Sequence, residues 1–235
     1  MPDLSRRSRD TEWMDTEAVS EADFAACLRD LATVNTLTRA RPPTIAWLRR
    51  ATRGLPRGAE VSVLDVGFGE GDMLRRIHRW GRRRGLKLRL HGIDLQTSSA
   101  AAARALTPDD WGIAYEVGDL FDLDPARRFD LIVSSLFAHH LDDGEVVAFL
   151  RWMERSAGRG WFINDLERDA FAYHGFRLLS AAAGWHRFVR HDGPVSISRA
   201  FRREDWARLL GEAGLDGVAE VRWRLPFRLC VGRLR

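Results

Sequence analysis

The chain is poor in the residues that build disulfide frameworks, zinc fingers and membrane spans. Its two cysteines, Cys27 and Cys230, lie far apart among 235 residues, so no disulfide framework and no zinc-finger spacing is visible. No run of about 18 apolar residues occurs, which argues against a membrane-spanning helix. With 45% hydrophobic and 30% charged residues, the composition is that of a globular protein, and we expect a cytoplasmic one.

Lysine is almost absent as well. Lys87 is the single lysine among 37 basic residues, and the formal net charge is only +4. Such an arginine bias is typical of a GC-rich coding sequence. The densest arginine cluster, in residues 79–84, lies at the end of a predicted helix that points away from the ligand-binding edge of an α/β sheet. We therefore do not expect nucleic acid as a partner.

The most informative segment is a glycine-rich turn after an apolar strand. Residues 61–66 read as a buried parallel strand, and Gly67, Gly69 and Gly71 follow at every second position. The next residues, from Asp72 on, have apolar side chains at helical spacing. Such a turn lets a ligand approach the backbone and the helix N-terminus without meeting a Cβ atom. Taken alone, the same turn also fits a tight strand-to-helix connection with no ligand.

Three further strands are predicted downstream, and each ends in polar residues. Asp94 lies at the end of the strand predicted for residues 88–95, and a Gly-Asp pair that contains Asp119 lies at the end of residues 115–120. The strand predicted for residues 129–134 ends at a pair of serines. An acid at the end of the second strand of a βαβ unit can accept hydrogen bonds from both ribose hydroxyls. The spacing predicts alternating strands and helices around a parallel sheet.

The pattern Asp65-x-Gly-x-Gly-x-Gly resembles the first motif of class I S-adenosylmethionine (SAM) methyltransferases, and the resemblance extends over residues 61–234. It implies an α/β, Rossmann-like sheet of seven strands with the last strand antiparallel. It also implies SAM as the cofactor and S-adenosylhomocysteine (SAH) as its product. The cofactor-binding residues that it implies are Asp65, Gly67, Gly69, Gly71, Asp94, Leu95, Asp119, Leu120 and Ser134.

Two adjacent histidines, His139 and His140, follow the fourth predicted strand, where this family keeps substrate-facing residues. Methyl transfer is an in-line displacement, so alignment of the acceptor is the main requirement. A phenol or enol must also lose a proton, and a histidine with a pKa near about 6.5 suits that task. We predict that one of the pair is a general base, with His140 preferred, and that the other packs at the loop. A metal site is the weaker idea, because adjacent histidines point differently and the sequence places no third ligand.

The rest of the chain is predicted to cover the substrate. Residues 1–55 read as an N-terminal helical lid segment with a capping box at Ser20, and residues 56–235 as the catalytic domain. Residues 169–200 form an insertion near the substrate site, in which residues 185–194 are expected to break a helix. A hairpin that turns at Pro226 is expected to end the sheet. The predicted substrate-binding residues are Trp13, Met14, Asn164, Tyr173, His174 and His191.

The segment His139-His140-Leu141 after the fourth strand resembles the corresponding segment of small-molecule methyltransferases of the quinone and natural-product type. We therefore predict O-methylation of a small aromatic or polyketide-like hydroxyl compound. No Asn-Pro-Pro-Tyr or Asp-Pro-Pro-Tyr segment follows the fourth strand, although such segments are typical of amino methylation. C-methylation of a quinol ring, an RNA or protein acceptor, and a non-catalytic SAM-binding subunit are the alternatives. The sequence leaves the acceptor, the pathway, and a monomer or homodimer open.

Overall fold

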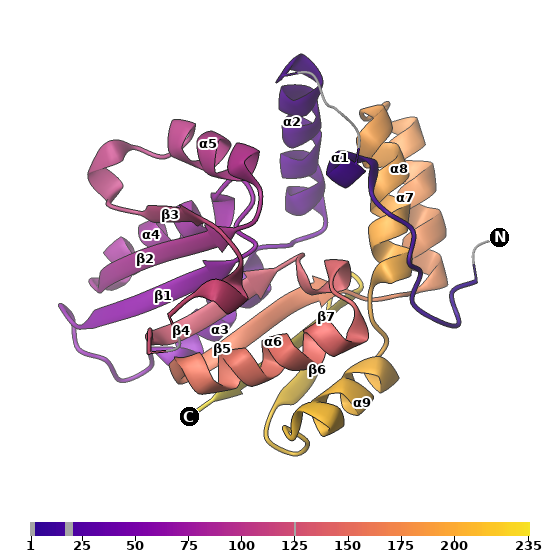
Figure 1. The fold of residues 1–235 in the computed structure, drawn as a ribbon. Coiled ribbons are helices and arrows are strands. Elements are labelled where there is room, and N and C mark those ends of the chain that lie inside the picture. The colour runs from indigo at the N-terminus through magenta and orange to yellow at the C-terminus, as the bar shows by residue number, and fades with distance from the viewer. Residues whose placement is uncertain (1–2, 17–20, 125) are drawn as a thin grey trace.

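A seven-stranded sheet forms the centre of the computed structural model, which describes residues 3–16, 21–124 and 126–235 (Figure 1). The strand order is β3-β2-β1-β4-β5-β7-β6, and β7 is antiparallel to both of its neighbours. The fold class predicted from the sequence is thereby confirmed, including the terminal hairpin. The strands are β1 (Glu60–Val66), β2 (Lys87–Asp94), β3 (Ala114–Val117), β4 (Phe129–Ser135), β5 (Ala157–Leu166), β6 (Glu220–Arg224) and β7 (Arg228–Leu234).

Helices cover both faces of this sheet, as a mostly parallel sheet requires. On one face, α6 (Asp143–Ser156) and α9 (Arg203–Ala213) pack in the core that contains Phe149 and Trp206. On the other face, α3 (Pro42–Ala51), α4 (Asp72–Arg84) and α5 (Thr97–Ala105) pack in the core that contains Trp47 and Ile77. Helix α3 therefore belongs to the sheet layers, although the sequence grouped it with the lid. The division of the chain near residue 55 stays a prediction.

The order of the strands determines where a ligand can bind. The chain goes from β1 outward to β2 and β3, and then returns to place β4 on the opposite side of β1. Loops that leave adjacent strands in opposite directions open a crevice at the carboxyl ends of those strands. The glycine-rich turn after β1 and the histidine turn after β4 flank this crevice.

A helical cap lies beyond these strand ends (Figure 1). It consists of α1 (Trp13–Thr16), α2 (Glu21–Leu37), α7 (Ala170–Ala182) and α8 (Arg187–Arg199). The cap has its own apolar cluster, in which Cys27 and Phe188 are buried and Leu31 and Val34 pack against them. Ser20, the predicted capping residue, lies outside the described residues.

The predicted helix break at residues 185–194 is right only at its start: α7 ends at Ala182 and residues 183–186 form a turn, but residues 187–194 are helical. Helix α8 begins at Arg187 and continues through Gly193 and Pro194. Tertiary packing explains the difference, because a Cβ atom at Gly193 would lie 2.0 Å from Cε1 of Phe176 on α7. The glycine thus permits a close contact between the two cap helices, and the cost of a proline inside a helix is offset by its burial.

Candidate active site

The glycine turn after β1 has three residues in the left-handed region. Gly67, Gly69 and Gly71 have φ values of 70°, 53° and 75°. A Cβ atom at Gly67 would lie 2.6 Å from the Phe137 ring, and one at Gly71 would lie 2.6 Å from the Tyr115 hydroxyl. At Gly69, no atom of the described residues lies within 4 Å of such a Cβ. Gly67 and Gly71 are therefore required by packing, whereas Gly69 borders open space.

Acidic side chains surround this turn. The Asp94 carboxylate accepts hydrogen bonds from the backbone N–H groups of Gly69 and Gln96, both at 2.9 Å. Asp65 is only 2% exposed, and burial, followed by the nearby charges of Asp94 and Asp72, raises its pKa well above the usual value. A cation near Asp65 would relieve the cost of burying this carboxylate.

The turn and the acids border a cavity of about 260 Å³. On the sheet side, it is lined by Asp65, Gly67, Gly69 and Ser135. The other walls come from α2, the turn before α3, α4, α5 and the start of the histidine turn, through Leu31, Asn35, Arg41, Asp72, Met73, Ser99, Ala102 and Leu136. Arg41 forms an ion pair with Asp72 at the start of α4, which closes this wall.

The remaining predicted cofactor residues are not among those that line this cavity. Asp119 begins a short helical turn and accepts from the N–H of Phe121 at 2.9 Å. Leu120 is buried in the core, whereas Leu95 is 64% exposed. The hydroxyl of Ser134 is buried in the sheet and donates to the Val66 carbonyl at 3.0 Å. Ser134 is thus occupied by the β1–β4 contact, and its neighbour Ser135 is the serine that lines the cavity.

An apolar pocket of about 470 Å³ adjoins the first cavity. Met14, Leu31, Asn35 and Leu136 line both, so the two spaces share a wall. The pocket lies between the cap and the sheet and is lined largely by apolar side chains. These include Val34, Leu37, Phe171, Phe176, Leu179, Val189, Ile197 and Phe227.

Glu12, His139 and His140 form the polar end of this pocket. His139 is buried, and its Nδ1 lies 2.7 Å from Asp165 Oδ1 at the end of β5. Its Nε2 lies 3.7 Å from Oε1 of Glu12, and His140 Nε2 lies 3.9 Å from the same oxygen. The two imidazole rings are 4.4 Å apart between centroids.

The charges of this cluster are strongly coupled. Burial by itself would lower the pKa of His139, but the carboxylates of Asp165 and Glu12 outweigh it and raise that pKa to about 9. Burial would raise the pKa of Glu12, yet His139 and His140 lower it to about 2. The two carboxylates thus favour positive charge at His139. His140, whose side chain is 30% exposed, is the histidine that is more accessible to a substrate.

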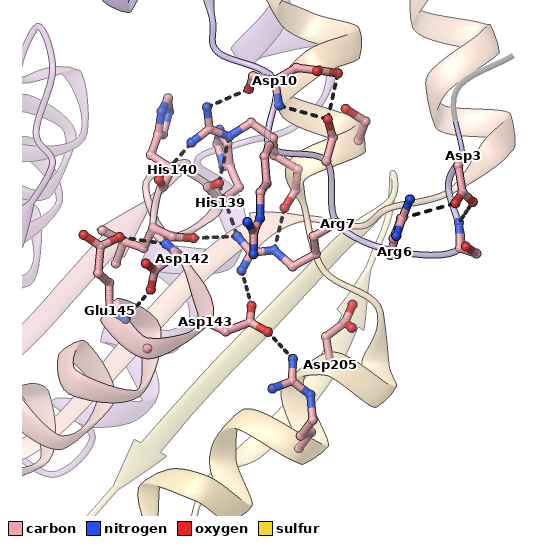
Figure 2. Close-up of a pocket in the computed structure, with 18 residues that line it drawn as sticks. Asp3, Arg6, Arg7, Asp10, His139, His140, Asp142, Asp143, Glu145 and Asp205 are labelled. Atoms are coloured by element: carbon pink, nitrogen blue, oxygen red, sulfur yellow. Dashed lines mark hydrogen bonds and ion pairs between the residues drawn. The ribbon is translucent and has the colours of Figure 1, made fainter.

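Two arginines fix the backbone of the histidine turn (Figure 2). Arg7 donates to the carbonyls of His139 and Leu141 at 3.3 and 2.7 Å, and it pairs with Asp143 at 2.6 Å. Arg199 of α8 donates to the carbonyls of His139 and His140 at 3.2 and 2.8 Å. The charged crevice around these residues, of about 1420 Å³, is crossed by intramolecular bonds of this kind, so the apolar pocket is the better candidate for a substrate.

Some of the predicted substrate residues lie at or near the pocket, and others lie away from it. Met14 lines both cavities, and Trp13 stacks on His191 with 3.7 Å between ring centroids. Tyr173 and His174 pack edge to face with each other, on the part of α7 that does not line the pocket.

Asn164 is the last of the predicted substrate residues, and it is buried behind the pocket. Its amide donates to the Ala40 carbonyl at 2.6 Å and to the Thr44 hydroxyl at 3.2 Å. These hydrogen bonds tie β5 to the start of α3, and Asn164 does not line the pocket.

Sequence reasoning missed Glu12 and did not pair Asp165 with His139. The pairing of Asp165 with His139 could have been found from the sequence. Asp165 lies at the end of one strand and His139 follows the neighbouring parallel strand, so both lie at the same edge of the sheet. Glu12 had no such signal, since it lies in an irregular segment far from the histidines in sequence.

Comparison with known proteins covers the middle of the chain. Residues 63–160, which run from β1 to β5, match the model of a methyltransferase domain family. Over this stretch the match agrees with the methyltransferase domain that the sequence analysis predicted. No curated protein matches the chain.

Solved structures, among them methyltransferases, have a similar fold. Magnesium protoporphyrin IX methyltransferase from Synechocystis, with bound SAH, is 14% identical at a TM-score of 0.53, over 93% of this chain and 89% of that one. A putative O-methyltransferase from Nostoc punctiforme is 15% identical at 0.55, over 88% and 59%. LepI, in complex with SAH and a substrate analogue, is 16% identical at 0.55, over 80% of this chain. This chain covers 46% of the length of LepI.

The charges at the glycine turn are compatible with SAM, which carries an amino group and a positively charged sulfur. Asp65 places a buried carboxylate in the wall of the cavity, Asp94 holds the turn through the Gly69 N–H, and Gly69 borders open space. Among the described residues, no helix is long and apolar enough to cross a membrane.

Proposed function

We propose that this methyltransferase transfers a methyl group to the hydroxyl oxygen of a small, apolar, aromatic or polyketide-like compound. The observation that carries the proposal is the wall shared by two cavities. The cavity at the glycine turn has charged residues such as Asp65 in its wall, the adjoining pocket is largely apolar, and Met14 and Leu136 border both. An acceptor in the apolar pocket can therefore present one polar atom to a cofactor in the first cavity.

The size and lining of the pocket favour a small molecule. A volume of about 470 Å³ lies within the range of about 300–1,000 Å³ that is typical of small-molecule sites. Phe171, Phe176 and Phe227 offer ring surfaces against which a planar acceptor can pack. An RNA or a protein acceptor would need an open groove, whereas this pocket is covered by α2, α7 and α8.

The Glu12–His139–His140 cluster supplies the polar end of the acceptor site. Bound SAM provides a methyl group on a positively charged sulfur. In the proposed reaction the acceptor oxygen forms a bond to that methyl carbon, the carbon–sulfur bond breaks, and SAH is released. The hydroxyl proton must leave, and the accessible His140, beside Glu12, is placed to receive it or to orient the hydroxyl.

The proposal is tested with the purified protein, labelled SAM and a panel of acceptors. The panel contains phenols, enolic polyketide mimics and quinols, with matched compounds in which the hydroxyl is already methylated. We expect label in the hydroxyl compounds and none in the methylated ones. Label on a ring carbon, identified by NMR of the product, would indicate C-methylation instead.

A matched variant separates the pocket from the cofactor site. Gly175→Leu narrows the apolar pocket at a position where a Cβ meets no atom of the described residues within 4 Å, so acceptor turnover should fall while SAH binding, measured by calorimetry, stays unchanged. Transfer to RNA or protein in a cell extract, with no transfer to any small hydroxyl compound, would contradict the proposal. Normal SAH binding with no transfer at all would favour a non-catalytic SAM-binding subunit.

A further inference from the structure

The cluster at the polar end of the pocket has the composition of a metal site. Glu12 Oε1 and one ring nitrogen of each of His139 and His140 lie within 4.8 Å of one another. Glu12 is 8% exposed and His139 is 3% exposed, so two of the three donors are buried. Buried imidazole and carboxylate groups that converge on one point are the donors that Zn²⁺, Co²⁺ and Fe²⁺ use in proteins.

The outer contacts of this cluster also match those of metal sites. A metal-ligating histidine typically donates its other ring N–H to a carboxylate, and a ligating carboxylate is itself hydrogen-bonded. His139 makes the first contact through Nδ1, 2.7 Å from Asp165 Oδ1, which leaves its Nε2 facing Glu12. Glu12 makes the second, since Ser196 Oγ donates to its Oε1 at 2.7 Å.

We propose that Glu12, His139 and His140 bind a divalent transition-metal ion of the Zn²⁺, Co²⁺ and Fe²⁺ class. Two imidazoles and one carboxylate leave coordination positions open, as catalytic metal sites do. Two of the three donors are nitrogens, so the site should discriminate against Mg²⁺ and Ca²⁺, which prefer oxygen.

The spacing of the donors requires only a small contraction. Donors about 2.1 Å from a metal at tetrahedral angles lie about 3.4 Å apart. The two distances from Glu12 Oε1 to the histidine nitrogens, 3.7 and 3.9 Å, are slightly longer than this spacing. They are also longer than an ordinary N–H···O hydrogen bond. Arg7 and Arg199 hold the backbone of the turn, so the contraction falls on side-chain torsions.

The role of the ion rests on the proposed function. All three ligands line the apolar pocket, so the open coordination positions are accessible to the acceptor. A divalent ion that binds the acceptor oxygen lowers the pKa of its hydroxyl, and the proton is released to solvent before methyl transfer. In this arrangement the histidines are ligands, and neither is a general base.

Titration of the protein with Co²⁺ tests the site without any cofactor or substrate. Stoichiometric binding should give visible ligand-field absorption, which Zn²⁺ abolishes by competition and Mg²⁺ does not. Glu12→Gln and His140→Asn should each weaken Co²⁺ binding by more than about 100-fold, since loss of an outer contact alone costs about 10–100-fold. Asp165→Asn should fall within that lower range, and His174→Asn, which changes an exposed histidine of α7, should have no effect.

The folding of each variant is checked by its near-ultraviolet circular dichroism. If Glu12→Gln does not fold, the partly exposed His140 carries the test through His140→Asn. Absence of the Co²⁺ spectrum in the wild type, or equal spectra in the wild type and His140→Asn, would overturn the proposal. Because no methyl transfer is involved, Co²⁺ binding can fail while methylation succeeds, and the reverse also holds.

Discussion

At the scale of single residues, the glycine turn separates glycines needed for packing from the one that faces a ligand. Gly67 and Gly71 touch aromatic side chains so closely that a Cβ would overlap them, while Gly69 borders the cavity. The sequence pattern treats all three alike. Only the surroundings of each glycine show which one a cofactor can reach.

Substitution of Gly69 should impair binding far more than folding. Gly69→Ala places a methyl group toward the cavity, at a φ of 53° that costs a non-glycine residue about 1–2 kcal/mol. We expect SAH affinity, measured by calorimetry, to fall by at least about 10-fold, with a small decrease in the melting temperature of the ligand-free protein. Gly67→Ala is the matched control, because its methyl group would meet Phe137 and should unfold the protein at a lower temperature. If Gly69→Ala binds SAH normally, the cofactor does not approach this residue.

The histidines should differ in what their loss does. His140→Ala should lower turnover by about 10²–10⁴-fold with SAH binding unchanged, the range for loss of a group that assists removal of the hydroxyl proton, whether His140 accepts it directly or acts as a ligand. His139→Ala leaves Asp165 buried without its imidazolium, so it should lower the free energy of unfolding by about 3–5 kcal/mol. Urea denaturation and initial rates separate the two effects. A stable His139→Ala protein would show that the Asp165 pair is not structural.

At the scale of elements, Asp192 attaches the N-terminal segment to the cap. Its carboxylate accepts from the backbone N–H groups of Trp13 and Met14, at 2.8 and 3.1 Å, and contacts His191 Nδ1 at 2.7 Å. These bonds join α1 to α8 and place Met14 in both cavities. The position of Glu12, two residues before Met14, depends on the same attachment.

Loss of this attachment should affect the acceptor more than the cofactor. Asp192→Ala removes both backbone contacts, so we expect the acceptor KM to rise by about 10-fold, equivalent to about 1.4 kcal/mol or one net hydrogen bond. Hydrogen exchange at residues 12–16 should accelerate. Asp169→Ala, which removes the cap of α7 instead, is the control, and it should leave exchange in that segment unchanged. Equal changes in both variants would argue against a specific role of Asp192.

The elements of the sheet could be predicted from the sequence, and those of the cap only in part. Apolar strands, the glycine turn and Asp94 follow local rules, so their placement at one edge of the sheet followed from the alternation of strands and helices. Helix α8 could not be predicted in this way, because the contact between Gly193 and Phe176 allows a helix where local propensity predicts a turn. Glu12 approaches His139 through packing of distant segments, and no local pattern records such a contact.

At the scale of the whole molecule, the buried acid Asp65 lowers the stability of the ligand-free protein while it favours binding of a cationic cofactor. Its pKa is raised by burial and by Asp94 and Asp72, so ionisation of Asp65 opposes folding. Its unfavourable contribution therefore begins as the pH rises above the unfolded pKa, near 3.8, and is complete above the folded pKa. Asp65→Asn has no such charge.

We expect Asp65→Asn to melt at a higher temperature than the wild type near neutral pH and to bind SAM more weakly. The stability difference, from urea denaturation at several pH values, should increase as the pH rises from about 4. Glu154→Gln is a control of opposite sign. Burial would raise the pKa of Glu154, but its bonds to Trp161 and Arg235 lower it, so this variant should lose stability above about pH 4.5. A difference for Asp65→Asn that does not change with pH would contradict the assignment.

Substitutions in the residues of α7 that border the pocket could change which acceptors bind without changing the binding of the methyl donor. Phe171, Gly175 and Leu179 lie on one side of this helix, remote from the glycine turn. Gly175 is costly inside a helix, and a Cβ there would meet no atom of the described residues within 4 Å. Larger residues at this one position would gain helix stability while narrowing the pocket. Selection for a broad or bulky acceptor would keep the glycine, and specialisation on a smaller one would replace it.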